Sequence, residues 1–313
     1  MGAPVPPTRR PRTTSGGRDQ PADPSTRTGI GAVDGQRGEP HRRRIHEGAT
    51  TTRHGLPEAG RVGRHRAGSR RHWRPLGSGT WVAIVLGLEP PSRRGTAVEL
   101  LAVEPKRCGA FPPGYTPTPL DCGLILGGLT ALKAVRDVLR TRSGQRLLVV
   151  GGGGPVGLAA IQVASLFGAH VDAVAGSRAR TACEQAGAQR FWDHRTDTTI
   201  VRNSGAYDGL VIAAGRPTNW IPAARRTGRA AITDGGAWPG SLPRGLRHRV
   251  ATRPIAAGHA TEDLEWLGRH IASGALTPVA GTLHYPHAAH EAFASLGGGR
   301  TAGARLIDHR GAA

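Results

Sequence analysis

A run of glycines between an apolar segment and a helix-like segment restricts the fold of this chain more than any other feature. Residues 147–150 form a continuous apolar run, which is typical of a strand buried on both faces of a parallel sheet. The glycine-rich turn 151–157 follows, and the pattern of 158–167 predicts a helix that stops at Gly168. Strand, glycine turn and helix in this order indicate a βα unit.

The turn matches the pattern G-x-G-x-x-G at Gly152, Gly154 and Gly157. The first glycine of this pattern permits a tight turn, the second lets the backbone approach a pyrophosphate, and the third lets helix and strand pack closely. Pro155 and Val156 belong to the same turn, and the helix N-terminus adds free N–H groups for phosphates. We predict that these five residues bind a cofactor. The alternative is an ordinary glycine-rich turn with no ligand.

The end of the next predicted strand, 171–175, selects the cofactor. In NAD-binding folds an acidic residue at this place binds the ribose hydroxyls. Here Ser177 and Arg178 follow the strand and no acid is present. A guanidinium can bind a 2′-phosphate that a carboxylate would repel, so we predict NADP(H). The alternative is that Arg178 only solvates the first turn of a helix.

The remaining pattern predicts an α/β fold built on a doubly wound parallel sheet. Further strands are expected at 190–192, 209–215, 229–233 and 250–255, with helical pieces between several of them. Gly215 and Gly235 follow the carboxyl ends of two of these strands, where doubly wound sheets bind ligands. Either glycine fits an ordinary turn as well.

The first 78 residues differ sharply from the rest. They contain 16 arginines, no lysine and one aromatic residue, Trp73. Such a segment cannot bury enough apolar surface to offset its conformational entropy, so we predict that it is disordered. Two other interpretations are a nucleic-acid-binding segment and the wrong reading frame of a GC-rich gene. The lack of stacking aromatics and of a known motif argues against nucleic acid.

Composition and patterning argue against several classes of protein. No run of 18 apolar residues is present, which excludes a transmembrane helix. The first 30 residues lack the apolar segment of a secretory signal. The three cysteines have neither the spacing of a disulfide framework nor a C-x-x-C pair. We therefore expect a cytoplasmic protein.

Short motifs occur in a fixed order between about residues 79 and 310. They are G-T-W-V-A at 79–83, G-T-A-V-E-L-L-A-V at 95–103, G-L-T-A at 128–131, the glycine turn, Y-D at 207–208 with Gly215, Y-P through E-A at 285–292, and G-A-R-L-I at 303–307. In this order they resemble the medium-chain dehydrogenase/reductase family, and most of all its zinc-free quinone oxidoreductase branch.

The resemblance implies a Rossmann domain at 123–256 and an incomplete GroES-like β domain formed by 79–122 and 257–313. It places Thr130 near the nicotinamide and implies hydride transfer from NADPH to a quinone, enone or carbonyl. It further implies a small-molecule substrate, leaves a homodimer open, and gives no reason to expect nucleic acid or a membrane as a partner. Residues 1–78 match none of the family's catalytic strands. The alternative is therefore a catalytically impaired cofactor-binding remnant, and no catalytic residue is assigned.

Zinc-dependent alcohol dehydrogenases of the same superfamily provide a second alternative. They have a cysteine four residues before the position of Thr130, where this chain has Leu126. Their G-H-E motif and four-cysteine lobe are absent as well. Catalytic zinc needs three suitably spaced protein ligands, and the histidines at 284, 287 and 290 lack a partner cysteine or carboxylate, so we predict no metal site. By resemblance to the quinone oxidoreductase branch, His194 stands where those proteins often have a tyrosine that packs against the adenine.

Overall fold

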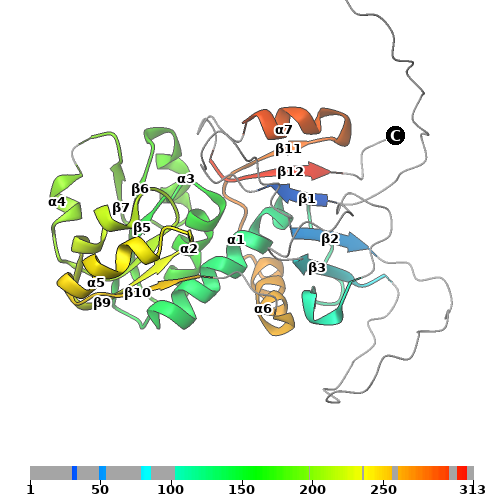
Figure 1. The fold of residues 1–313 in the computed structure, drawn as a ribbon. Helices are drawn as coiled ribbons and strands as arrows, with labels where there is room; N and C mark the ends of the chain where they lie inside the picture. The colour runs from blue at the N-terminus through cyan, green and yellow to red at the C-terminus, as the bar shows by residue number, and fades with distance from the viewer. Residues whose placement is uncertain are drawn as a thin grey trace, which may run out of the picture.

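Two six-stranded sheets lie side by side, with helix α1 (Gly123–Leu132) between them (Figure 1). The computed structural model describes the backbone of 30–33 and 49–53 and, with side chains, residues 79–85, 103–196, 198–234, 236–255, 260–295 and 302–308. The motif at 95–103 lies almost wholly outside the described residues. No helix in the described part of the chain is long and apolar enough to cross a membrane.

One sheet is parallel throughout and has the strand order β10-β9-β8-β5-β6-β7. With β5 taken as the first strand, this is the doubly wound order 3-2-1-4-5-6. The predicted α/β fold with a doubly wound parallel sheet is therefore confirmed. Its strands are β5 (Arg146–Val150), β6 (His170–Ala175), β7 (Arg190–Asp193), β8 (Tyr207–Ile212), β9 (Ala224–Ile232) and β10 (Ala251–Pro254).

Both faces of this sheet are covered, which explains why its strands read as continuous apolar runs. Leu147 and Val149 of β5 pack in one cluster with α1 and α2 (Pro155–Leu166), whereas Leu148 and Val150 pack in another with Trp220. Helix α2 begins at Pro155, three residues before the predicted start, because a proline fits the first helical position. Gly168 ends this region with φ +75°, as the sequence predicts.

Further helices connect the strands and cover the second sheet. A π-helix, η3 (Lys133–Leu139), continues α1 toward β5. The other helices are α3 (Arg180–Gln185), α4 (Thr199–Arg202), α5 (Leu242–His248), α6 (Thr261–Ala272) and α7 (Ala289–Ser295). Thr261 is the first residue of α6 and does not cap it. Ala260 holds the cap position, and the Thr261 hydroxyl instead donates to the carbonyl of Pro105 at 3.2 Å.

The second sheet has the order β11-β12-β1-β2-β3-β4, and only its β11–β12 pair is parallel. Its strands are β1 (Ile30–Val33), β2 (Ala49–Arg53), β3 (Trp81–Val85), β4 (Cys108–Ala110), β11 (Gly281–His284) and β12 (Ala304–Asp308). It combines strands from the front of the chain with strands from its end.

Two strands of this sheet, β1 and β2, come from the segment 1–78, for which the composition predicts disorder. The structure differs from that prediction at these two places. Strand β1 pairs with β12, and β2 pairs with β3, so both obtain backbone hydrogen-bond partners from family-like sequence. Strand β2 also contains three consecutive threonines, which are β-branched and favour extended backbone.

Candidate functional site

A cleft of about 920 Å³ lies at the carboxyl ends of the parallel strands. It opens where β5 neighbours both β6 and β8, which is the point at which the strand order reverses. Doubly wound sheets bind ligands at this point, and the volume falls in the usual range for small-molecule sites. The glycine turn, the start of α2, the ends of β6, β8 and β9, and residues 302, 303 and 305 line the cleft.

The glycine turn is held against β6 by its own backbone. The N–H groups of Gly151 and Gly152 both donate to the carbonyl of Val174, at 2.8 and 2.9 Å. Gly151, with φ +85°, makes the tight turn, a role that the sequence pattern assigned to Gly152. Gly152 instead lies behind the turn, where a Cβ would meet Cys183 Sγ at 3.1 Å, and it does not line the cleft. Four glycines in a row allow more than one register of the pattern, so the sequence could not decide between them.

The start of α2 fits a phosphate-binding group. Leu158 N donates the first helical hydrogen bond, to the carbonyl of Gly154, so the amides of Val156 and Gly157 precede the hydrogen-bonded part of the helix. Gly154 has no side chain that could cap these amides. A Cβ at Gly154 would meet a single protein atom within 4 Å, so glycine keeps the space beside the helix end open. Gly154, Pro155, Val156 and Gly157 all line the cleft. That they bind a cofactor stays a prediction.

Gly157 lets α2 approach the strand, as the sequence pattern predicts. A Cβ there would lie 2.7 Å from Gly152 Cα and 2.8 Å from the carbonyl carbon of Gly151, and closer still to the Gly151 oxygen. Real Cβ atoms do not make such contacts. The distance between the helix end and the turn therefore depends on glycine at this position.

Ser177 and Arg178 lie at the rim of the cleft, in the short 3₁₀-helix that follows β6. Both side chains are exposed. His194 lies beside them, with its ring 3.5 Å from where a Cβ of Gly176 would stand. The structure thus brings together the residues that the sequence assigns to the phosphate-bearing ribose and the adenine.

An acid that the sequence analysis did not weigh lies nearby. Asp193, at the end of β7, accepts a hydrogen bond from the Arg195 N–H at 3.0 Å. That bond, together with His194 and the Ser177 hydroxyl and amide, lowers the pKa of Asp193 below its ordinary value. Asp193 does not itself line the cleft. The sequence pattern directs attention to an acid after β6, whereas Asp193 is the last residue of β7.

Three other predicted cofactor contacts have different outcomes. Gly215 lines the cleft just after β8, with φ +77°. Gly235 lies outside the described residues, although its neighbour Asp234 lines the cleft. Thr130 is buried in the last turn of α1, where its hydroxyl donates to the carbonyl of Leu126 at 3.0 Å, and it does not line the cleft. Its nearness to a nicotinamide therefore stays a prediction.

Sequence reasoning missed most of the basic side chains of the cleft. Beside Arg178, the described lining includes Arg195, Arg202, Arg216 and Arg305. Its described acidic lining is limited to Asp234. Arg178, Arg195, Arg202 and Arg216 lie in loops or short helices between strands, and Arg305 lies in β12. Nothing in their local sequence distinguishes these residues from the many other arginines of the chain.

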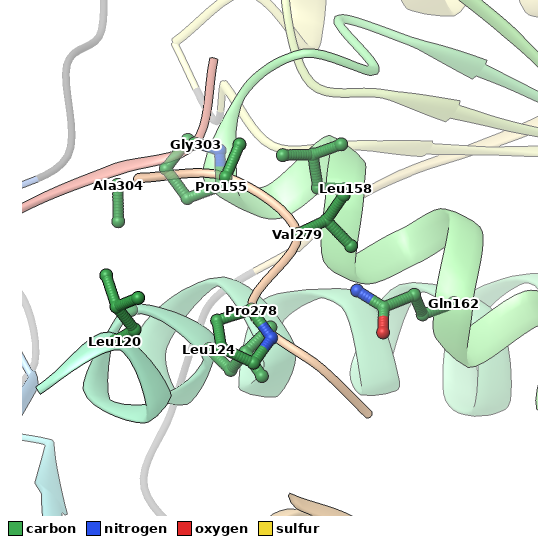
Figure 2. Close-up of a pocket in the computed structure, with 11 residues that line it drawn as sticks. Leu120, Leu124, Pro155, Leu158, Gln162, Pro278, Val279, Gly303 and Ala304 are labelled. Carbon is green, nitrogen blue, oxygen red and sulfur yellow. The ribbon is translucent and has the colours of Figure 1, made fainter. Parts of the chain in front are cut away.

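A second pocket lies behind the cleft, between α1 and α2 and the loop 278–280 (Figure 2). At about 20 Å³ it holds little more than a water molecule, so it is too small for a substrate. Gln162 of α2 fixes the loop, since its side-chain amide both donates to and accepts from Thr277, at 3.0 and 2.8 Å. Close by, Gly303 N donates to Gly153 O at 2.9 Å and links the glycine turn to the second sheet.

No group of three histidine, cysteine or acidic side chains that could hold a metal ion occurs among the residues with described positions. Cys122 holds the N-cap position of α1 without a side-chain capping hydrogen bond, and Leu126 lies one turn further on in that helix. Burial raises the pKa of the Cys183 thiol to about 12, which makes it unreactive at neutral pH.

No protein-family model matches the chain. Among curated proteins it is similar to the trans-enoyl reductase pgmF of Aspergillus terreus, with 29% identity over 220 residues that cover 63% of this chain and 60% of that protein. It is also similar to the human mitochondrial NAD(P)H oxidoreductase RTN4IP1, with 30% identity over 159 residues, or 49% of this chain and 38% of that protein. The chain thus spans less than two thirds of the length of either relative.

Solved structures show the same fold. A quinone oxidoreductase from Coxiella burnetii superposes with a TM-score of 0.67 at 19% identity, and the match covers 75% of this chain and 74% of that one. A mycobacterial protein solved with NADPH superposes with a TM-score of 0.63 at 22% identity, covering 74% and 75%. These relatives and structural neighbours are medium-chain dehydrogenases/reductases, which confirms the resemblance predicted from the sequence.

Proposed function

We propose that this chain is an NADPH-dependent, zinc-independent oxidoreductase that transfers hydride to a quinone, enone or carbonyl compound. The observation that carries the proposal is the cleft at the strand-order reversal, with two α2 amides at its floor and Arg178 at its rim. When bound, the nicotinamide supplies the hydride. The chain's own residues bind the phosphates, orient the dinucleotide and exclude water from the cleft.

The charge of the cleft supports a phosphorylated dinucleotide. Arginines outnumber acids among its described lining residues, and a guanidinium can bind a phosphate through two parallel hydrogen bonds. Asp193 opposes this preference. However, its charge is already engaged by the Arg195 amide and His194, and it lies outside the cleft. The proposed preference for NADPH over NADH therefore rests on Arg178.

Zinc independence and the substrate class are supported by likeness alone. Leu126 stands where zinc-dependent members have a cysteine. The names of the relatives, an enoyl reductase and an NAD(P)H oxidoreductase, point to reduction of a conjugated or quinone substrate.

A cofactor-binding remnant without turnover is the second candidate. It is favoured by the segment 1–78, which supplies β1 and β2 but matches none of the family's catalytic motifs. NADPH binding, followed by fluorescence, and NADPH oxidation with 1,4-benzoquinone distinguish the two. Binding with turnover that survives a chelator supports the proposal. Binding without turnover supports the remnant, and the absence of binding contradicts both.

Arg178→Ala tests the cofactor preference. We expect the affinity for NADPH to fall about tenfold, because one charge-assisted phosphate contact at an exposed, solvent-screened rim is lost. The affinity for NADH should change little. Arg244→Ala, which removes an exposed arginine of α5 outside the cleft, is the matched control. Equal losses for NADPH and NADH would contradict the assignment.

A further inference from the structure

The edge of the parallel sheet opposite the cleft is rich in arginine. All six strands begin at this edge, and the cleft lies at the other, about 16 Å away for a five-residue strand such as β5. None of the arginines of this edge lines the cleft. The exposed ones are Arg146 of β5, Arg190 of β7, Arg225 and Arg226 of β9, and Arg249, two residues before β10. We call these five residues the amino-edge row.

Contacts through Asp208 of β8 hold one half of the row together. Its Oδ2 accepts a hydrogen bond from the Arg146 N–H at 2.7 Å, and its Oδ1 lies 2.6 Å from Nη2 of Arg225. On the far side of β9, the Thr227 N–H donates to the carbonyl of Arg249 at 2.9 Å. Arg146, Arg225 and Arg249 therefore follow one another along the edge, from β5 to the start of β10.

The row continues from β5 to β7 in the other direction. Arg190 lies opposite Asp172 of β6 in the strand register, and Asp172 Oδ2 lies 3.5 Å from Nη2 of Arg146. Neighbouring strands are about 4.8 Å apart, so a row across six strands is about 24 Å long. The whole width of the sheet thus carries arginine at this edge.

Acidic side chains balance only part of this charge. Asp172 and Asp208 each pair with one arginine of the row. Arg190, Arg226 and Arg249 are exposed and form no ion pair with the residues whose positions the structure describes. Three positive charges along the edge are therefore open to an anionic partner that is extended rather than small.

An exposed apolar side chain flanks the β10 end of the row. Leu246 of α5 is 80% exposed, more than any other large apolar side chain in the described part of the chain, and its carbonyl accepts a hydrogen bond from the Arg249 N–H at 3.1 Å. Leu242, one helical turn earlier, is 38% exposed. The phosphates of a nucleic acid offer these leucines no apolar contact. A lipid bilayer offers both an apolar layer and anionic headgroups.

We propose that the amino-edge row and Leu246 dock this chain on the surface of a membrane rich in anionic phospholipids. Interfacial segments bind such membranes through apolar side chains at the headgroup boundary and through basic side chains attracted to the headgroups. The family resemblance gives no reason to expect this partner. The inference is also independent of the proposed function, because the cleft lies at the opposite edge and stays open to solvent.

Co-sedimentation of the full chain with vesicles tests the proposal. Vesicles of phosphatidylcholine alone are compared with vesicles that also contain phosphatidylglycerol, at about 0.1 M salt. We expect binding to the anionic vesicles only. Each basic residue near an anionic surface contributes about fivefold in affinity, so a triple variant of the row should bind about a hundredfold more weakly. Its substitutions are Arg190→Gln, Arg226→Gln and Arg249→Gln.

Two further proteins separate the row from net charge and from other polyanions. The control variant loses three positive charges elsewhere, through Lys106→Gln, Lys133→Gln and Arg269→Gln, and should bind nearly as the unaltered chain does. Leu246→Ala should weaken binding to anionic vesicles about tenfold, because less apolar surface leaves water. It should not change the binding of a single-stranded oligonucleotide, measured by fluorescence anisotropy.

Each other outcome overturns the proposal. Equal binding to both kinds of vesicle would show that headgroup charge is not recognised. Equal losses in the two triple variants would show that only net charge matters. Retained binding by the row variant would assign it to another part of the chain, such as the arginine-rich residues 1–78. An oligonucleotide bound more tightly than vesicles, or no effect of Leu246→Ala, would indicate a nucleic-acid surface instead. If the row variant does not fold, its three single substitutions decide, each with an expected loss of about fivefold.

Discussion

Replacing Gly157 by alanine measures how closely α2 must approach the glycine turn. The new methyl would stand 2.7 Å from Gly152 Cα and 2.8 Å from the carbonyl carbon of Gly151, both backbone atoms that cannot rotate away. Such overpacking costs about 1–3 kcal/mol. Alanine recovers at most about 1 kcal/mol of helix propensity relative to glycine. The cost of overpacking therefore exceeds the gain in helix propensity, and we expect a net loss of about 1–2 kcal/mol in the free energy of unfolding.

This loss corresponds to a decrease in Tm of about 2–8 °C, which differential scanning calorimetry resolves. The turn must shift to admit the methyl, so the affinity for NADPH should fall at least about tenfold. Gly154→Ala is the matched control, because its Cβ would meet only the Gly151 oxygen, at 3.6 Å. It should keep the Tm of the unaltered chain and still weaken NADPH, since the methyl enters the cleft. A Gly157→Ala protein with unchanged Tm and affinity would refute the close approach.

Two predictions concern groups away from the cleft. Tyr207→Phe removes a hydroxyl that donates to Asp172 Oδ2 at 2.8 Å, and we expect a loss of about 1–3 kcal/mol in urea unfolding at pH 7. Burial, followed by the bond to Asp172, raises the pKa of Tyr207, so its contribution is lost as pH rises past about 10, where the unfolded tyrosine ionises. A difference between the two proteins that stays constant up to pH 11 would contradict this. Cys183 should resist a thiol reagent at pH 8 until the chain unfolds, because burial raises its pKa to about 12. Rapid labelling of Cys183 in the native protein, located by mass spectrometry, would count against its burial.

The parallel sheet could be predicted from local sequence, because each apolar run and each turn glycine that indicates a strand or its end lies within a few neighbouring residues. The apolar run at 147–150 is sufficient to predict a strand buried on both faces. Gly168 is sufficient to predict the end of the following helix, because glycine readily adopts the positive φ found there. The partner of the Thr261 hydroxyl could not be predicted in this way, because it is the carbonyl of Pro105, 156 residues earlier. The pairing of β1 with β12 could not be predicted from local pattern either, because the two strands are far apart in the sequence.

The part of the candidate site that could be predicted lies between β5 and the segment just after β6. Gly154, Gly157, Ser177 and Arg178 carry recognisable chemistry in adjacent segments, and the structure places all four at the cleft. Arg202 does not, because its distinguishing property is contact with an indole that lies 18 positions later in the sequence. Contacts of this kind depend on how loops from different strands meet.

The hydrogen bond from Gly303 to Gly153 has a mechanical consequence. The peptide that joins Gly153 to Gly154 is anchored twice, through its carbonyl to Gly303 and through its N–H to the carbonyl of Gly151, so its plane cannot rotate when a ligand arrives. Gly303 leads directly into β12, which pairs with β1. Strand β1, from the arginine-rich front of the chain, is therefore connected to the glycine turn through β12 and a single backbone hydrogen bond.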